Sequence, residues 1–474
     1  MLNVQNPTGP GLGSADPGLL AGGRLTDPEC HKERRDVGAF VTGAQQGESS
    51  SATCSSEGAS CCDTDDDGST DSEDDDDDGF GSFDSLSLDK KWTTADGYNL
   101  TTFDQTECGS WAIDQPLPLP LWAKESKPAL VIDKLYAYES LVALIETTLQ
   151  HMMQETYYDT VNNFIDFYQS FRDSRFKNLR EFFQNYSPPV NRRHHMCVSL
   201  AMEIVSRIAV QRPEIADHFY LVSCEEAVED PISYIGVCED KTIENAAWSL
   251  EKEHSLVAMK IVIAGREGLM ILDPGYHVAR AVTIMKDQNY PHTGFFTHSD
   301  EPGCKREYCY TFSHKSDSFI TWRERTTRNG QQKYEMSLIY VDRPYKTAID
   351  VTVRRNLIYD FRSLLSRDAK GRVFAGIYFP VIPNTADANI TLFYDEGIDN
   401  KICKTKVKFA VFKDVTKIPD TIMNHLHKLV PQLRVELSAM IDMLKTLADI
   451  VADADFVQQS LAINDMITVL SADN

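Results

Sequence analysis

Apolar and polar positions divide the chain into parts with different periodicities. From Ile132 to Phe171, apolar residues recur every three or four positions, as on the buried face of a helix. A second, wider stripe runs from Leu200 to Ala209 and predicts a central, buried helix that begins near Cys197. Pro188-Pro189 and Pro213 are expected to end these helical stretches, because the residue before a proline avoids the helical conformation.

The pattern changes to that of strands at His254. Residues His254 to Ile263 and Gly268 to Asp273 are rich in β-forming side chains, and the turn between them, around Ala264-Gly265, predicts a hairpin. Further short strands are expected at residues 308–313, 318–324, 334–341, 373–381, 390–394 and 404–412. With the helices before them, these strands predict an α+β fold.

The last part of the chain predicts a helix with a narrow apolar seam. Eight residues alternate at spacings of four and three: Leu426, Val430, Leu433, Leu437, Met440, Leu444, Leu447 and Val451. Pro431 interrupts the first turns. This spacing suits either a coiled coil or a helix packed on its own domain. We expect the helical stretch from Ile132 to Phe171 to cover the seam, so that a monomer is favoured over a dimer.

The first 111 residues carry few large apolar side chains and many Gly, Ser and Asp residues. Such a segment buries too little apolar area to offset the entropy of ordering it, so the sequence predicts a disordered acidic arm. Prolines alternate with leucines from Pro116 to Trp122, which predicts an extended segment. The expected domain limits are therefore 1–111 for the arm, 112–415 for the folded α+β domain and 416–474 for a C-terminal helical segment.

Charge and cysteine content narrow the classes of function. The net charge is −24, and eleven carboxylates lie between Asp63 and Asp78, so we expect no binding to nucleic acid. No window is apolar enough for a membrane span, and the first 21 residues lack the pattern of a secretory signal. The eleven scattered cysteines are therefore expected to be free thiols in a cytoplasmic or nuclear protein.

The acidic arm also matches part of a calcium-binding loop. Asp63, Asp65, Asp67 and Gly68 occupy positions 1, 3, 5 and 6 of such a loop, and Asp74 occupies position 12. Position 12 is usually Glu, and neither flank predicts a helix. A solvated acidic tract is the favoured interpretation. A protein partner is a separate candidate ligand for the arm.

Three residues on different predicted elements have the side chains that thiol acyl transfer requires. Cys197 lies in the first turn of the buried helix, where the helix dipole and unpaired N–H groups favour a thiolate. His254 opens one strand of the predicted hairpin and Asp273 closes the other, which places them within a residue or two of directly opposite. The pattern predicts a nucleophile, a base and a group that orients the base.

The order and placement of these residues resemble the papain-like thiol superfamily, in particular arylamine N-acetyltransferases and transglutaminase-like domains. The sequence from Glu253 to Val257 is similar to the His motif of the acetyltransferases, and the sequence from Ile271 to Tyr276 to their Asp motif. The resemblance covers roughly Tyr157 to Phe412 and implies a papain-like fold with a β-barrel-like sheet. It assigns Cys197 as the acyl-accepting nucleophile, His254 as its base and Asp273 as the orienting group.

The resemblance implies transfer of an acyl group, from acetyl-CoA or another acyl-CoA, to a small-molecule amine or a protein substrate. Acetyltransferases of this kind have Arg-Gly-Gly before the cysteine, whereas His194-His195-Met196 stands here. Two alternatives stay open. One is a transglutaminase-like amidase or protease, and the other is a non-catalytic interaction protein on the same scaffold.

A zinc site formed by His194, His195 and Cys197 with Cys224 or Cys238 is disfavoured. Adjacent histidines rarely point at one metal, and no pair of cysteines has the spacing of a zinc site. No metal is therefore expected.

Overall fold

The computed structural model describes residues 115–190, 192, 195–239, 252–301, 303–397 and 401–469, together with Tyr98, Phe103, Gln105 and Trp111. Almost all of the expected acidic arm, including the calcium-loop stretch, lies outside the described residues. Tyr98 and Phe103 are buried, and the Tyr98 hydroxyl donates a hydrogen bond to Glu203. Contacts with the folded domain therefore begin before the expected boundary at residue 111.

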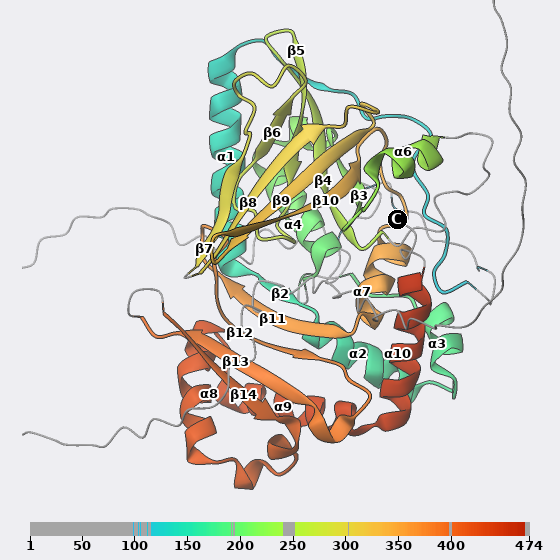
Figure 1. The fold of residues 1–474 in the computed structure, drawn as a ribbon, viewed down its shortest axis with the longest axis vertical. Coiled ribbons are helices and arrows are strands. Elements are labelled where there is room, and N and C mark those ends of the chain that lie inside the picture. The colour runs from blue at the N-terminus through green and yellow to red at the C-terminus, as the bar shows by residue number, and fades with distance from the viewer. Residues whose placement is uncertain are drawn as a thin grey trace, which may run out of the picture. The chain divides into compact units, whose positions relative to one another are not determined.

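The larger of two sheets in the described chain curls on itself (Figure 1), with the strand order β6-β5-β4-β3-β10-β9-β8-β7. A short strand, β1, pairs in parallel with the end of β4, beyond the point where β3 stops. The strands are β1 (Leu130–Ile132), β3 (Phe219–Glu225), β4 (His254–Ile263), β5 (Arg266–Leu272), β6 (Val282–Met285), β7 (Phe296–Glu301), β8 (Cys304–Phe312), β9 (Phe319–Arg328) and β10 (Gln331–Tyr340).

The smaller sheet is antiparallel, with the order β14-β13-β12-β11-β2. Its strands are β2 (Tyr157–Asp159), β11 (Phe361–Arg367), β12 (Val373–Pro380), β13 (Asn389–Asp395) and β14 (Ile402–Lys408). Strand β2 comes from the N-terminal part of the domain, yet it pairs with β11. This pairing joins distant parts of the sequence beside α4, the helix that begins at Cys197.

Ten α-helices are found in the described residues: α1 (Leu135–Glu155), α2 (Val161–Asp173), α3 (Leu179–Asn185), α4 (Cys197–Gln211), α5 (Pro213–Ala216), α6 (Pro231–Glu239), α7 (Arg354–Ile358), α8 (Asp420–Gln432), α9 (Leu437–Ala452) and α10 (Ala454–Thr468). Shorter helical turns are η3 (Ile349–Val353), η4 (Thr385–Asp387), η5 (Phe409–Lys413) and η6 (Val415–Lys417). None of the described helices combines the length and the apolar character that crossing a membrane requires.

Helix α4 confirms the prediction of a central, buried helix. It packs against α1, β3 and β4, and most of its residues are buried. It ends at Gln211, as expected from Pro213, which then opens the short helix α5 at a position where its missing N–H is not needed. The wide apolar stripe therefore places the first residue of α4, Cys197, in the interior of the domain.

The predicted hairpin is also confirmed. Strands β4 and β5 are joined by the two residues Ala264 and Gly265, whose φ angles are 48° and 79°. Positive φ at both positions is typical of the tight turn that matches the twist of the two strands. Strands β3 and β11 were not predicted, because they are buried on both faces and lack the alternation of a half-exposed strand.

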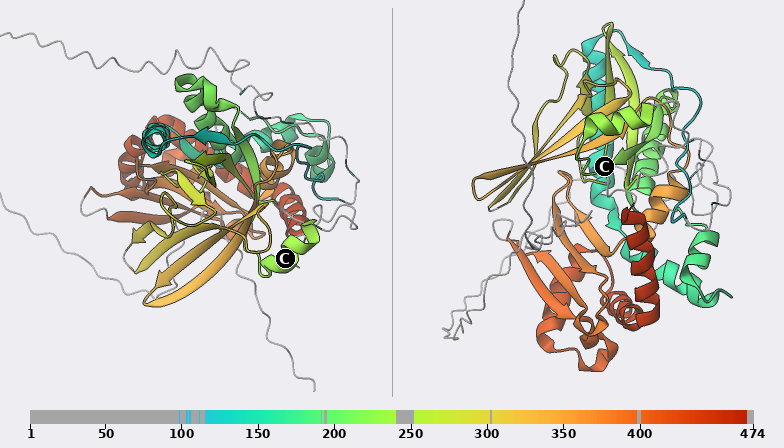
Figure 2. Two further views of the ribbon diagram at one scale, coloured as in Figure 1. Left: turned by 90° about the horizontal axis from the view of Figure 1, so that it is seen from above. Right: turned by 45° about the vertical axis from the view of Figure 1, so that its right-hand side comes forward.

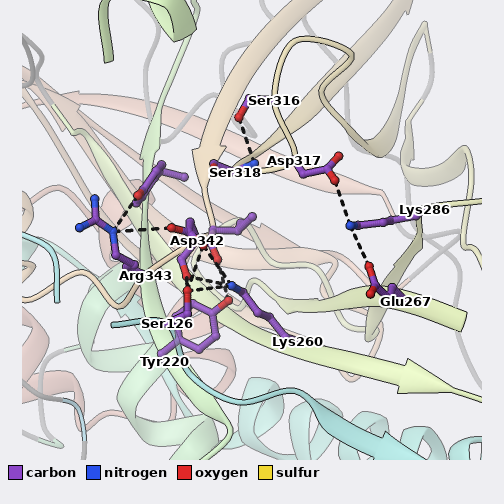
Figure 3. Close-up of polar contacts among 12 residues, drawn as sticks. Ser126, Tyr220, Lys260, Glu267, Lys286, Ser316, Asp317, Ser318, Asp342 and Arg343 are labelled. Atoms are coloured by element: carbon purple, nitrogen blue, oxygen red, sulfur yellow. Dashed lines mark hydrogen bonds and ion pairs between the residues drawn. The ribbon is translucent and has the colours of Figure 1, made fainter. Parts of the chain in front are cut away.

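The expected extended segment lies along the larger sheet. Trp122 forms an antiparallel bridge with Tyr345. Further along, Lys260 on β4 donates to Ser126 Oγ (3.1 Å) and to the carbonyl oxygen of Asp342 (2.9 Å), as Figure 3 shows. These contacts fix the path of the chain between the proline-rich segment and β1.

The prediction of a single C-terminal helix is wrong. Helices α8 and α9 are separated by a turn in which Arg434 has a φ of 49° and the Val435 N–H donates to the Val430 carbonyl. This arrangement ends a helix and is usually marked by glycine, so the residues around Arg434 do not predict it. A further helix, α10, packs against α3 and α7 (Figures 1 and 2).

The apolar seam itself is covered within the chain. Seven of its eight residues are buried, and Leu437 is half-buried. Helix α8 packs on β12 and β13, whereas α9 packs on η5 and α2. The stretch from Ile132 to Phe171 therefore covers only part of the seam, through α2, and the smaller sheet covers much of the rest.

Replacement of Leu444, which is fully buried on α9, tests this packing. Leu444→Ala should lower the free energy of unfolding in urea by roughly 2–5 kcal/mol, because it leaves a cavity. The neighbouring exposed change Lys445→Ala should alter it by less than about 0.5 kcal/mol. Sedimentation should show a monomer for all three proteins. A wild-type dimer that Leu444→Ala dissociates would show that the seam is an interface.

Candidate active site

Cys197 is the first residue of α4, and the residues before it are held from two sides. The Met196 N–H donates to Ser199 Oγ at 2.8 Å, which closes the first helical turn. The Asp159 N–H on β2 donates to the His195 carbonyl at 2.7 Å. Cys197 is a free thiol that is only 2% exposed. Its position is therefore fixed by both the helix and the smaller sheet.

His254 and Asp273 form a buried hydrogen-bonded pair. His254 Nε2 lies 3.0 Å from Asp273 Oδ1, and both residues are 1% exposed. Since a carboxylate only accepts, Nε2 is the donor, and Nδ1 is the ring nitrogen left for another partner. In the β4–β5 register, Val257 lies opposite Leu272, so Asp273 is two residues from directly opposite His254, as expected.

Cys197 and His254 meet at Gly275. A Cβ atom added to Gly275 would lie 2.8 Å from His254 Cε1 and 3.0 Å from Cys197 Cβ. These distances are too short for any side chain, so glycine permits the close approach of the turn after Asp273. The structure thus brings the three residues of the predicted triad together.

The electrostatics of the pair favour a protonated imidazole. Burial by itself would lower the pKa of His254. The Asp273 carboxylate and its hydrogen bond, with a further contribution from Cys197, instead raise that pKa well above its usual value. An imidazolium at neutral pH is a suitable partner for a thiolate.

Asn356 on α7 is a part of the site that sequence reasoning missed. Its Nδ2 lies 3.9 Å from Cys197 Sγ and donates to the Glu253 carbonyl (3.2 Å) and to the Thr352 carbonyl (2.8 Å). The Thr352 hydroxyl in turn donates to the Lys252 carbonyl at 2.9 Å. Both carbonyl groups before His254 are therefore held from this helical segment, and no sequence pattern around Asn356 indicates it.

A wide helical turn brings these two side chains into place. In η3, directly before α7, the Val353 N–H donates to the Ala348 carbonyl, five residues back. Such turns are rare and often occur at functional sites. The wider turn shifts the phase of the helix, which directs Thr352 and Asn356 toward the start of β4.

Tyr158 on β2 is the second residue that was missed. It is 3% exposed, and its hydroxyl has no hydrogen-bond partner among the described residues. Burial, followed by the nearby Cys197 thiol, raises the pKa of Tyr158 well above its usual value, so the hydroxyl stays protonated. A buried donor without a partner costs about 1–3 kcal/mol and is rare in native proteins. The site therefore contains an unused donor close to Cys197.

The residues of the alternative zinc site are not gathered around one point. Cys224 lies opposite His254 across β3 and β4, and Cys238 is on α6. His195 is buried beside the Tyr98 hydroxyl (3.3 Å), and burial lowers its pKa to about 4. His194 lies outside the described residues. Within the described part of the chain, no group of three or more His, Cys, Asp or Glu side chains is placed to hold a metal ion.

Comparison with known proteins found no match: no protein-family model, no curated protein and no solved structure is similar to this chain. Membership of the papain-like superfamily therefore stays a prediction.

Removal of the Asp273 charge tests the electrostatics. In Asp273→Asn, burial should dominate, and the pKa of His254 should fall below that of an exposed histidine. The titration of its Cε1–H resonance by NMR measures this change. Asp287→Asn, at an exposed carboxylate that pairs with Arg266, should leave the His254 titration unaltered. An unchanged titration in Asp273→Asn would contradict the assigned cause.

The same pKa makes stability depend on pH. Because the pKa of His254 is higher in the folded than in the unfolded protein, protonation stabilises the fold. This contribution is fully present below about pH 6.5 and declines as the pH rises through the folded-state value. Urea unfolding across this range should show the decline in the wild type and not in His254→Gln.

Gly275→Ala tests the close approach of the turn to the site. The added methyl group would overlap Cys197 and His254, so the free energy of unfolding should fall by roughly 1–3 kcal/mol. Gly236→Ala, where nothing lies within 4 Å, is the matched control and should be neutral or stabilising. Equal stability of the two variants would mean that the turn at Gly275 is not in close contact with Cys197 and His254.

Proposed function

We propose that this protein is a thiol-dependent acyltransferase that transfers an acyl group to an amine, on a papain-like scaffold. Cys197 is the nucleophile, His254 its base and Asp273 the group that orients the base. The observation that carries the proposal is the buried hydrogen bond between His254 and Asp273, set against a cysteine at the start of a helix. A nucleophile, a base and an orienting group in contact are what this chemistry requires.

The reaction proceeds in two steps. Cys197 sulfur attacks the carbonyl carbon of a thioester donor, a bond forms between this carbon and sulfur, and the donor thiol leaves with a proton from His254. The amine then attacks the acyl-Cys197 thioester and forms the new C–N bond. His254 takes the proton of the amine and returns it as the bond between carbon and Cys197 breaks. The products are an amide and a free thiol.

The negative oxygen that forms in each step needs hydrogen-bond donors. The Tyr158 hydroxyl is a buried donor without a partner, and Cys197 contributes to its raised pKa. The Asn356 amide is 3.9 Å from Cys197 Sγ. We assign the oxyanion to Tyr158, because the Asn356 amide already donates to two backbone carbonyls and serves to position the start of β4.

One observation favours a different function. Cys197, His254 and Asp273 are 2%, 1% and 1% exposed, so a bulky acyl donor reaches the sulfur only after part of the covering chain moves. A non-catalytic interaction protein on the same scaffold has no need of such access. An amidase or protease would use water in place of the amine, and the products of the reaction distinguish it.

Intact-mass spectrometry after incubation with acetyl-CoA and other acyl-CoAs tests the proposal. An acyl adduct is expected on the wild type and on Cys304→Ala, a change at a more exposed thiol, but not on Cys197→Ala. Iodoacetamide at neutral pH should also label Cys197 before Cys304. The absence of any adduct, together with slower labelling of Cys197, would favour the non-catalytic alternative.

Tyr158→Phe tests the oxyanion assignment. Loss of one such donor should lower kcat by about 10²–10³-fold, while stability should stay the same or rise because an unpaired hydroxyl is removed. Tyr308→Phe on β8 removes another buried hydroxyl without a partner and is the matched control, with an unchanged kcat expected. Equal rates for the two variants would remove Tyr158 from the mechanism.

A further inference from the structure

A polar cavity of about 280 Å³ lies beside the segment 277–280, shortly after the turn that carries Asp273 and Gly275. Its walls come from α1, from this segment, from β7 and from Lys370 in the turn between β11 and β12. A Cβ atom on Gly371 would lie 2.0 Å from the His277 carbonyl oxygen, so this turn packs tightly against the segment. Gln150 Nε2 on α1 donates to the Ala279 carbonyl at 3.2 Å, which fixes the opposite side.

Two cations on the wall form no ion pair within the described part of the chain. Neither Arg280 nor Lys370 forms an ion pair with a described residue, and the Arg280 guanidinium lies 5.0 Å from the centre of the Phe296 ring. The wall has one carboxylate, Glu146, whose Oε1 accepts a hydrogen bond from the Ala281 N–H at 3.1 Å. Two cations and one carboxylate give the wall a net charge of +1, although the chain as a whole carries a net charge of −24.

Two histidines on the wall contribute no charge. Burial lowers the pKa of His298 to about 3 and, with help from the buried Arg367, lowers that of His277 well below its usual value. The positive charge of the wall at neutral pH thus comes from Arg280 and Lys370. These two side chains come from different loops and are both exposed, so they can approach a bound group from two sides.

We propose that this cavity binds a small dianion, the phosphate group of a phosphate monoester. Arg280 and Lys370 can each donate to a different oxygen of a phosphate, which has three terminal acceptor oxygens, whereas a carboxylate has only two. The volume is close to the lower end of that of small-molecule sites and accommodates a phosphate with a small organic substituent. The proposal rests on the cavity and its charges, and it does not depend on the proposed acyl transfer.

Isothermal titration of the full-length protein at constant ionic strength tests the site with three probes: inorganic phosphate, phenyl phosphate and benzoate. Phenyl phosphate should bind, and benzoate should bind more weakly by roughly tenfold or more, since it carries one charge. Tighter binding of phenyl phosphate than of inorganic phosphate would identify an organic phosphate as the ligand, whereas equal affinities would identify free phosphate.

The double variant Arg280→Gln/Lys370→Gln should weaken phenyl phosphate binding by roughly tenfold or more. Both side chains are exposed at their tips, so the fold should be retained, and thermal unfolding verifies this. Arg328→Gln/Lys333→Gln on the exposed end of the β9–β10 hairpin changes the net charge equally and should bind as the wild type does. The proposal is overturned if no probe binds, if benzoate binds as tightly as phenyl phosphate, or if the two double variants bind alike.

Discussion

The hydrogen bond between His254 and Asp273 is effective because water is excluded from it. In this buried setting a single carboxylate outweighs the cost of burying the imidazolium, and the raised pKa of His254 follows. Its geometry depends on several separate constraints. The two-residue turn fixes the β4–β5 register, and Gly275 permits the chain to pass close to the His254 imidazole ring. Thr352 and Asn356 hold the two backbone carbonyl groups that precede His254. A change at any of these positions is expected to act on the candidate site through the His254–Asp273 pair.

Two buried arginines on strand β11 donate hydrogen bonds to segments that border the candidate site. Arg362 donates to the Asn356 and Leu357 carbonyl groups at the end of α7, and Arg367 donates to the Pro274 carbonyl and the Thr156 hydroxyl. Burial lowers the pKa of each to about 9. Through Arg362, strand β11 is bonded to the helix that carries Asn356. Through Arg367, it is bonded to the turn that carries Gly275. One strand of the smaller sheet sets the spacing of two walls around Cys197.

The candidate triad could be predicted because each member stands at an element boundary that has a strong local pattern. The stripe after Cys197 and the hairpin between His254 and Asp273 are short-range features, and the structure places them as expected. Asn356 and Tyr158 reach the site through a wide helical turn and a long-range strand pairing, which leave no periodic signal. Strands β3 and β11 were missed because they are buried on both faces. The break at Arg434 was missed because a non-glycine residue adopts the left-handed conformation there.

The pairing of β2 with β11 also affects the order in which parts of the candidate site form while the chain is being synthesised. Tyr158 and Cys197 leave the ribosome long before Leu364 and Leu365, the β11 partners of β2. The β4–β5 hairpin closes locally, so the His254–Asp273 pair can form early, whereas closing the smaller sheet requires a contact across much of the domain and is correspondingly slow. We expect the nascent chain to pass through a stage in which Cys197 and His254 are present but the walls around them are not. We therefore expect full enclosure of Cys197 to be among the last events of folding.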